Sequence, residues 1–287
     1  MRDLAAFVMR GPRQAAIVAF VCTLIPMLFW LGAAVVGLVT LRQGFSKGLA
    51  ILIWALIPAL GWWLGMQDPG ALVVLVNTLL MAAVLRATVS WQLTFVSGAA
   101  WSVLIGILIP WLAPELIEML VGMADQVFQE LAKDADLEYT GEVQDSFRSL
   151  MIASFAATFF GIALGALCLA RAWQAQLYNP GGWQEEFYRI RFEPKLLLGM
   201  MLAMFVAPYL GIDATLVFLI ALLPILVCGI ALVHGLIGMK KLGGQWLIGF
   251  YAVVVMLFPT TLFLIAMMAI LDSVMNFRSR VESQSTP

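Results

Sequence analysis

The side chains best suited to binding chemistry gather in one short segment between two apolar runs. Trp183, Phe187 and Ile190 recur at i, i+4 and i+7, while Glu185 and Arg189 are spaced i, i+4. This spacing predicts a helix of about two turns with an aromatic stripe and a paired charged stripe. Such a helix lies on a membrane face. It is either a simple interfacial connector or a docking surface for a protein partner or lipid head groups.

A turn sequence, Asn179-Pro180-Gly181-Gly182, comes directly before this segment. Proline fixes φ, and the glycines accept the positive φ that tight turns need. Arg residues and aromatic side chains are the types that most often anchor interfaces. The candidate functional or docking positions are Asn179, Pro180, Gly181, Gly182, Trp183, Phe187, Arg189 and Arg191.

A second candidate site consists of the polar or amphipathic residues Asn77, Gln92 and Trp101, which fall within apolar runs. They either line a polar cavity or are packed. The runs contain no carboxylate of the kind that carries protons in coupled transporters. His234 is the only histidine, and the three cysteines fall singly in different runs. We therefore expect no catalytic cluster, no metal site and no cofactor, and the chain is not expected to be an enzyme.

The composition sets the environment of these residues. Hydrophobic residues make up 63% of the 287 residues and charged residues 11%, whereas a soluble domain carries about 25% charged residues. The apolar runs are continuous and do not alternate, which excludes a β-barrel. We predict an all-α polytopic transmembrane helical bundle of about eight spans in contact with the lipid bilayer. Amphipathic surface helices are expected near residues 115–133 and 183–192. Net charge −1 gives no sign of a nucleic-acid partner.

The whole chain, 1–287, is predicted to be a single integral membrane domain. N-terminal spans occupy 15–112, an acidic extracytoplasmic segment occupies 113–147, and C-terminal spans occupy 148–272 with a cytoplasmic turn at 171–195. The run at 15–41 either crosses the membrane once or turns back as a helical hairpin.

Charge bias gives the orientation, because Lys and Arg favour the cytoplasmic side. Placing the central turn in the cytoplasm leaves the acidic segment outside, together with Lys133, Arg148, Arg278 and Arg280. A helical multi-pass protein of this kind is expected in the bacterial inner membrane.

Several local sequences carry a family resemblance: Arg171 with Asn179-Pro180-Gly181-Gly182, then Phe187–Arg191, Val233-His234-Gly235 and the ending Leu271–Arg278. In these the chain resembles the YybS-like family of uncharacterised bacterial multi-pass membrane proteins. That family is similar in fold to the substrate-binding S components of energy-coupling-factor transporters. The resemblance implies small-molecule transport, or the substrate-binding subunit of a transporter, with an unidentified small-molecule ligand. The alternative is a membrane scaffold or regulator that docks a protein partner through the cytoplasmic turn.

Overall fold

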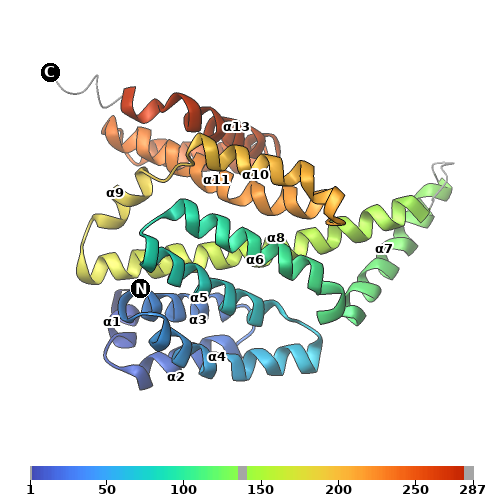
Figure 1. The fold of residues 1–287 in the computed structure, drawn as a ribbon, viewed down its shortest axis with the longest axis horizontal. Coiled ribbons are helices and arrows are strands. Elements are labelled where there is room, and N and C mark those ends of the chain that lie inside the picture. Colours follow the sequence, from blue (N-terminus) through green and yellow to red (C-terminus); the bar gives the residue numbers. More distant parts are fainter. Residues whose placement is uncertain (1, 135–140, 281–287) are drawn as a thin grey trace.

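The computed structural model describes residues 2–134 and 141–280, and throughout these ranges the regular structure is helical. The predicted all-α bundle is confirmed (Figure 1). The elements are α1 (Arg2–Val8), α2 (Pro12–Leu24), α3 (Phe29–Gln43), α4 (Phe45–Met66), α5 (Gly70–Thr88), α6 (Trp91–Leu112), α7 (Pro114–Asp134), α8 (Gly141–Tyr178), α9 (Gly182–Tyr188), α10 (Pro194–Val206), the 3-10 helix η1 (Ala207–Leu210), α11 (Ala214–Met239), α12 (Gln245–Met256) and α13 (Thr260–Met275).

Five of these helices, α4, α5, α6, α8 and α11, are long and apolar enough to cross a bilayer. Five shorter apolar segments accompany them within the described residues: α2, α3, α10 with η1, α12 and α13. A bilayer core about 30 Å thick needs roughly 20 helical residues to span it. The chain is therefore a multi-pass membrane protein that combines full-length spans with shorter helices.

The helices form three groups side by side (Figure 1). Helices α1 to α5 make one outer group, α6 and α8 lie in the middle, and α10, α11 and α13 make the other outer group. Helix α3 packs against α2, α4, α5 and α8, and every residue from Gly32 to Leu41 is buried. A helix that is apolar on all sides belongs inside a bundle, and α3 fills that place.

The run at 15–41 forms a helical hairpin, one of its two predicted arrangements. Helix α2 ends at Leu24 and α3 begins at Phe29, and the two helices pack against each other. Pro26 lies in the connecting turn and Met27 adopts a positive φ of 67°. The start of α2 and the end of α3 therefore lie at the same end of the bundle.

The last apolar run of the C-terminal spans, residues 246–271, is also two helices. It breaks between α12 and α13, where the chain passes through Leu257, Phe258 and Pro259. As a result, the end of α13 returns to the central turn, where the Ser273 hydroxyl donates a hydrogen bond of 2.9 Å to the Phe192 carbonyl. The predicted placement of Arg278 and Arg280 on the side opposite the central turn is wrong.

This arrangement gathers nearly all the positive charge at one end of the bundle. We call it the basic end: α3, α5, α8, α11 and α13 finish there, and α2, α4, α6 and α10 begin there. Every Lys and Arg except Lys133 and Arg148 belongs to a segment at the basic end. The charge bias is thus more one-sided than the predicted orientation assumed, and it favours a cytoplasmic basic end.

The acidic segment forms α7, which pairs with the first part of α8 and projects beyond the other helices (Figure 1). The rings of Phe128 and Phe147 meet edge to face with centroids 5.3 Å apart, and Gln144 donates a hydrogen bond to Asp125. Residues 135–140 of the predicted acidic segment lie outside the described residues. Helix α8 begins at Gly141 and continues without interruption for 38 residues.

Cysteine labelling tests both the fold and the orientation. In a variant whose three native cysteines are replaced by Ala, we expect Ser146→Cys to react with a membrane-impermeant maleimide in intact cells. Ser279→Cys is expected to react only after permeabilisation, because both positions are exposed but lie at opposite ends. Reaction of both cysteines from the same side would contradict the return of α13. The reversed pattern would contradict a cytoplasmic basic end.

Candidate functional site

The turn before α9 forms as its sequence predicts. Gly181 has φ of 90°, a left-handed conformation that glycine adopts without steric cost. The Gly182 amide donates a hydrogen bond of 3.0 Å to the Asn179 carbonyl, and Pro180 is exposed between them. The turn reverses the chain at the end of α8, so that α9 lies back against the bundle at the basic end.

The aromatic stripe of α9 faces the bundle. The Trp183 ring lies 5.6 Å from Trp91 of α6, and the Phe187 ring meets His234 of α11 at 5.5 Å, centroid to centroid. Ile190, just after the helix, is only 4% exposed. Of the two interpretations of this stripe, its packing against α6 and α11 agrees with a connector and not with an open docking surface.

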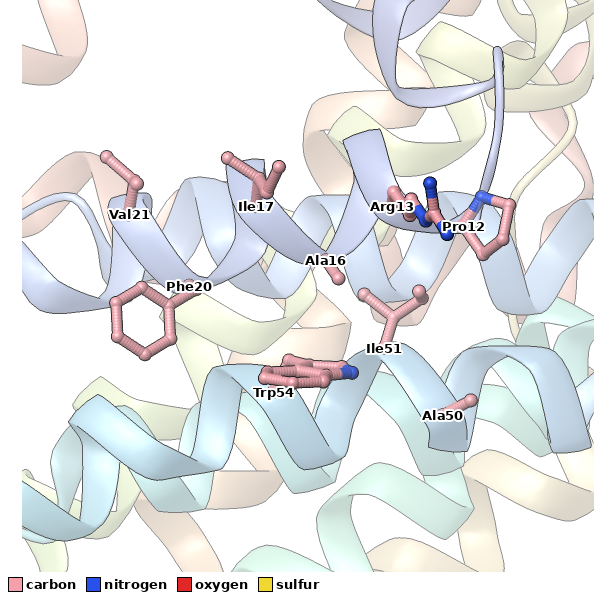
Figure 2. A pocket seen from close by; sticks show the side chains of 9 residues that line it. All are labelled: Pro12, Arg13, Ala16, Ile17, Phe20, Val21, Ala50, Ile51 and Trp54. Atoms are coloured by element: carbon pink, nitrogen blue, oxygen red, sulfur yellow. The ribbon is translucent and has the colours of Figure 1, made fainter.

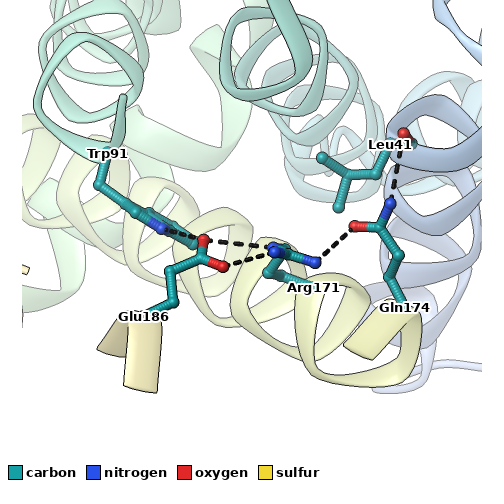
Figure 3. A network of polar contacts seen from close by, with 5 residues as sticks. All are labelled: Leu41, Trp91, Arg171, Gln174 and Glu186. Atoms are coloured by element: carbon teal, nitrogen blue, oxygen red, sulfur yellow. Dashed lines mark hydrogen bonds and ion pairs between the residues drawn. The ribbon is translucent and has the colours of Figure 1, made fainter. Parts of the chain in front are cut away.

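The acid of α9 that forms an ion pair is Glu186 (Figure 3). Its carboxylate binds Arg171 of α8 at two points, Nη2 to Oε2 at 2.5 Å and Nε to Oε1 at 3.2 Å. The Trp91 indole donates to Oε1 at 2.6 Å. Arg171 also donates to Gln174 at 3.0 Å, and Gln174 donates to the Leu41 carbonyl at 3.4 Å. This network joins α3, α6, α8 and α9, and two-point Arg–carboxylate pairs fix orientation well.

The predicted pair of Glu185 with Arg189 does not form. The helix ends at Tyr188, so Arg189 leaves the helical spacing that the pairing requires. Across residues 2–134 and 141–280, the ion pairs join other residues, and neither Arg189 nor Arg191 has an acidic partner. Arg189 is exposed and Arg191 is half-buried, which leaves two guanidinium groups available to a ligand.

Two polar hollows flank these arginines. The first, which we call the α9 cleft, lies between α9, the start of α6 and the end of α8, and has a volume of about 490 Å³. Its polar lining includes Ser90, Gln92, Asn179, Glu185, Arg189 and Arg191, with the Arg171–Glu186 pair beside them. The second hollow, about 530 Å³, lies on the other side of Arg189 and Arg191 and includes Asn276 and Arg278.

A buried arginine holds the segment that carries Arg191. The Arg278 guanidinium, whose side chain is 8% exposed, donates to the Ile190 carbonyl at 2.9 Å and lies 3.7 Å from the Asp272 carboxylate. It also reaches the Cys228 carbonyl at 3.5 Å. Burial lowers the pKa of Arg278 from its ordinary value, and the charge of Asp272 opposes that shift. This contact ties the chain after α9 to α11 and α13.

The second predicted site, a shared polar cavity, is not formed. Asn77 is buried and donates to the Ser102 hydroxyl at 2.9 Å, as part of the packing between α5 and α6. Trp101 is half-buried on the same stretch of α6. Gln92 lies at the basic end, where its side-chain oxygen accepts the Glu193 amide at 3.2 Å. Only Gln92 of these three residues lines the α9 cleft.

The residues that position the cleft were not among the predicted site residues. Trp91 and Glu186 are 95 positions apart, so no local spacing connects them. Arg171 entered the sequence analysis only through the family resemblance, and Arg278 only through that resemblance and the charge bias. Comparison of the chain with protein-family models, with curated proteins and with solved structures gives no match.

Proposed function

We propose that this protein is a solute-binding protein of the bacterial inner membrane, the ligand-binding part of a small-molecule transporter, and that its ligand occupies the α9 cleft. The observation that carries the proposal is the pair of unpaired guanidinium groups, Arg189 and Arg191, in a polar hollow of about 490 Å³. Pockets for small molecules have volumes of about 300–1,000 Å³. The resemblance to the YybS-like family points in the same direction.

The charge of the cleft favours an anionic ligand. Arg171 and Glu186 neutralise each other, which leaves Arg189 and Arg191 against the single carboxylate of Glu185. Arg is suited to two-point recognition of carboxylate and phosphate groups. Ser90, Gln92 and Asn179 supply neutral donors and acceptors. The ligand class is therefore a small polar molecule with a carboxylate or phosphate group.

The helix breaks agree with a transport role. Discontinuous helices are common in transporters. Here one break separates α2 from α3, another separates α12 from α13, and α10 passes into η1 before it reaches α11. These breaks lie at the end of the bundle opposite the α9 cleft, so they agree with a transporter architecture without contributing to the cleft. Within the described chain no cluster of His, Cys, Asp and Glu residues has the geometry of a metal site. Solute binding is the activity that the polar lining of the cleft supports.

Thermal unfolding of the detergent-solubilised protein tests this proposal. In a panel of small carboxylates and phosphate esters, we expect at least one compound to raise the melting temperature. A ligand at 100 times its Kd stabilises a protein by about 2.7 kcal/mol. The double variant Arg189→Gln/Arg191→Gln is expected to lose this stabilisation at the same ligand concentration.

The matched control is Lys195→Gln/Lys240→Gln, which removes two exposed charges at the same basic end and outside the α9 cleft. It is expected to keep the full shift. The proposal fails if no carboxylate or phosphate ester stabilises the protein. It also fails if both double variants respond as the parent does.

A further inference from the structure

An apolar groove runs along the outer surface of the bundle between α2 and α4 (Figure 2). Its volume is about 520 Å³. The hollow exists because small residues, Ala16 on α2 and Ala50 on α4, line it where larger side chains would close it. Phe20 and Trp54 lie farther along, and Arg13 and Pro12 lie at the other end.

The groove has one charged end. Arg13 is the only charged residue in its lining, and it is exposed at the basic end of the bundle. Lys47 is exposed in the first turn of α4, one turn before the groove residues Ala50 and Ile51. Within residues 2–134 and 141–280, neither of the two bases has an acidic partner. An anion at this end would therefore meet uncompensated positive charge.

The length of the groove fits one membrane leaflet. From Arg13 to Val21 the helix rises about 12 Å, at 1.5 Å per residue. Half of a hydrocarbon core about 30 Å thick is about 15 Å. Ile17 and Val21 are exposed along this path, 62% and 44% respectively, so the groove opens toward the surrounding lipid.

One polar group lies within the apolar part. The Trp54 indole has no hydrogen-bond partner in the described chain, and its nitrogen lies on the side of the ring that faces the Arg13 end (Figure 2). Tryptophan is enriched where apolar and polar parts of a membrane meet. An ester carbonyl that links a phosphate at Arg13 to an acyl chain in the groove would satisfy this donor.

We propose that the α2–α4 groove is a binding site for an anionic phospholipid, with the phosphate at Arg13 and Lys47 and one acyl chain along Ala16, Phe20 and Trp54. The two bases favour an anionic head group, and the apolar groove holds the acyl chain. The site is separate from the α9 cleft and does not depend on the function proposed for that cleft.

Native mass spectrometry of the intact protein tests the proposal. The delipidated protein is incubated with equal amounts of phosphatidylglycerol and phosphatidylcholine of the same chain length. We expect one phosphatidylglycerol molecule to be retained at least tenfold more often than phosphatidylcholine. Arg13→Gln/Lys47→Gln is expected to abolish this preference, whereas the control Lys195→Gln/Lys240→Gln, with the same loss of charge, keeps it.

A second variant tests the contribution of the acyl chain to binding separately from that of the head group. Ala16→Phe fills the groove without a change of charge, and it is expected to reduce phosphatidylglycerol retention at least tenfold. Glycerol phosphate, which has the anionic group and no chain, is expected not to compete. Equal retention of both lipids by the parent would overturn the proposal. So would equal loss in the charge variant and its control, or full competition by glycerol phosphate.

Discussion

Arg278→Met is expected to lower the free energy of unfolding by about 3–5 kcal/mol, the usual cost of removing one partner from a buried ion pair. The substitution leaves Asp272, which is 1% exposed, as an uncompensated buried charge. It also removes the donor that meets the Ile190 carbonyl at 2.9 Å. Denaturant or thermal unfolding in detergent, followed by tryptophan fluorescence, measures the loss.

Two further variants give this prediction its controls. Lys195→Met removes an exposed base near the same end and is expected to change stability by less than about 0.5 kcal/mol. Asp272→Asn/Arg278→Met neutralises both partners and keeps an oxygen to accept the Phe277 amide. It is expected to recover part of the loss, because coupled pairs are not additive. The single variant Asp272→Asn completes the cycle. If the double variant loses as much stability as Asp272→Asn and Arg278→Met lose together, the charges are not coupled.

Gly229→Ala is expected to have the second largest effect. A Cβ at this position of α11 would collide with the backbone carbonyl of Ile265 in α13, which cannot rotate away as a side chain does. Helices approach this closely in membranes where small residues line the contact. We expect a loss of about 1–3 kcal/mol, the typical cost of overpacking, measured as a lower unfolding midpoint in detergent.

Gly165→Ala on α8 is the matched control, because a Cβ there meets no atom within 4 Å. Alanine is favoured over glycine inside a helix by about 1 kcal/mol, so this variant is expected to be as stable as the parent or more stable. If both substitutions destabilise the protein to the same degree, close packing of α11 on α13 is not the cause.

Local periodicity allowed some of the fold to be predicted. Helix α7 at Pro114–Asp134 agrees closely with the expected surface helix at 115–133, because its apolar and acidic residues alternate with helical spacing. A helix also forms where one was expected at 183–192, but α9 spans Gly182–Tyr188 and so ends four residues early. In both segments the signal lies within about 20 residues of sequence, which is the range that a periodic pattern covers.

The helix breaks were harder to predict, because a proline in a membrane protein can either end a helix or lie inside one. Pro26 and Pro259 lie at breaks, but Pro58, Pro110 and Pro224 lie inside the continuous helices α4, α6 and α11. Neighbouring helices satisfy the backbone groups that such a proline frees. The presence of a proline therefore does not decide whether a helix ends. The packing of the surrounding helices decides it.

The candidate site was only partly predictable for a related reason. The aromatic stripe of Trp183 and Phe187 was identified, but its spacing did not show whether it faces the bundle or the surroundings. In a soluble protein an apolar stripe faces the interior, whereas lipid is as apolar as the core of a membrane protein. Sequence alone therefore gives no preference between the two. The partners that settle the direction, Trp91 and His234, come from distant helices.

The continuous length of α8 has a mechanical consequence. Its 38 residues measure about 57 Å, nearly twice the thickness of the hydrocarbon core. Near one end, Arg171 forms part of the wall of the α9 cleft, and near the other, Gln144 is bound to α7. Buried residues of α8 extend from Ala153 to Ala175, so the bundle holds the helix over most of the length between these two ends. A single rigid helix therefore connects the α7–α8 hairpin with the wall of the α9 cleft.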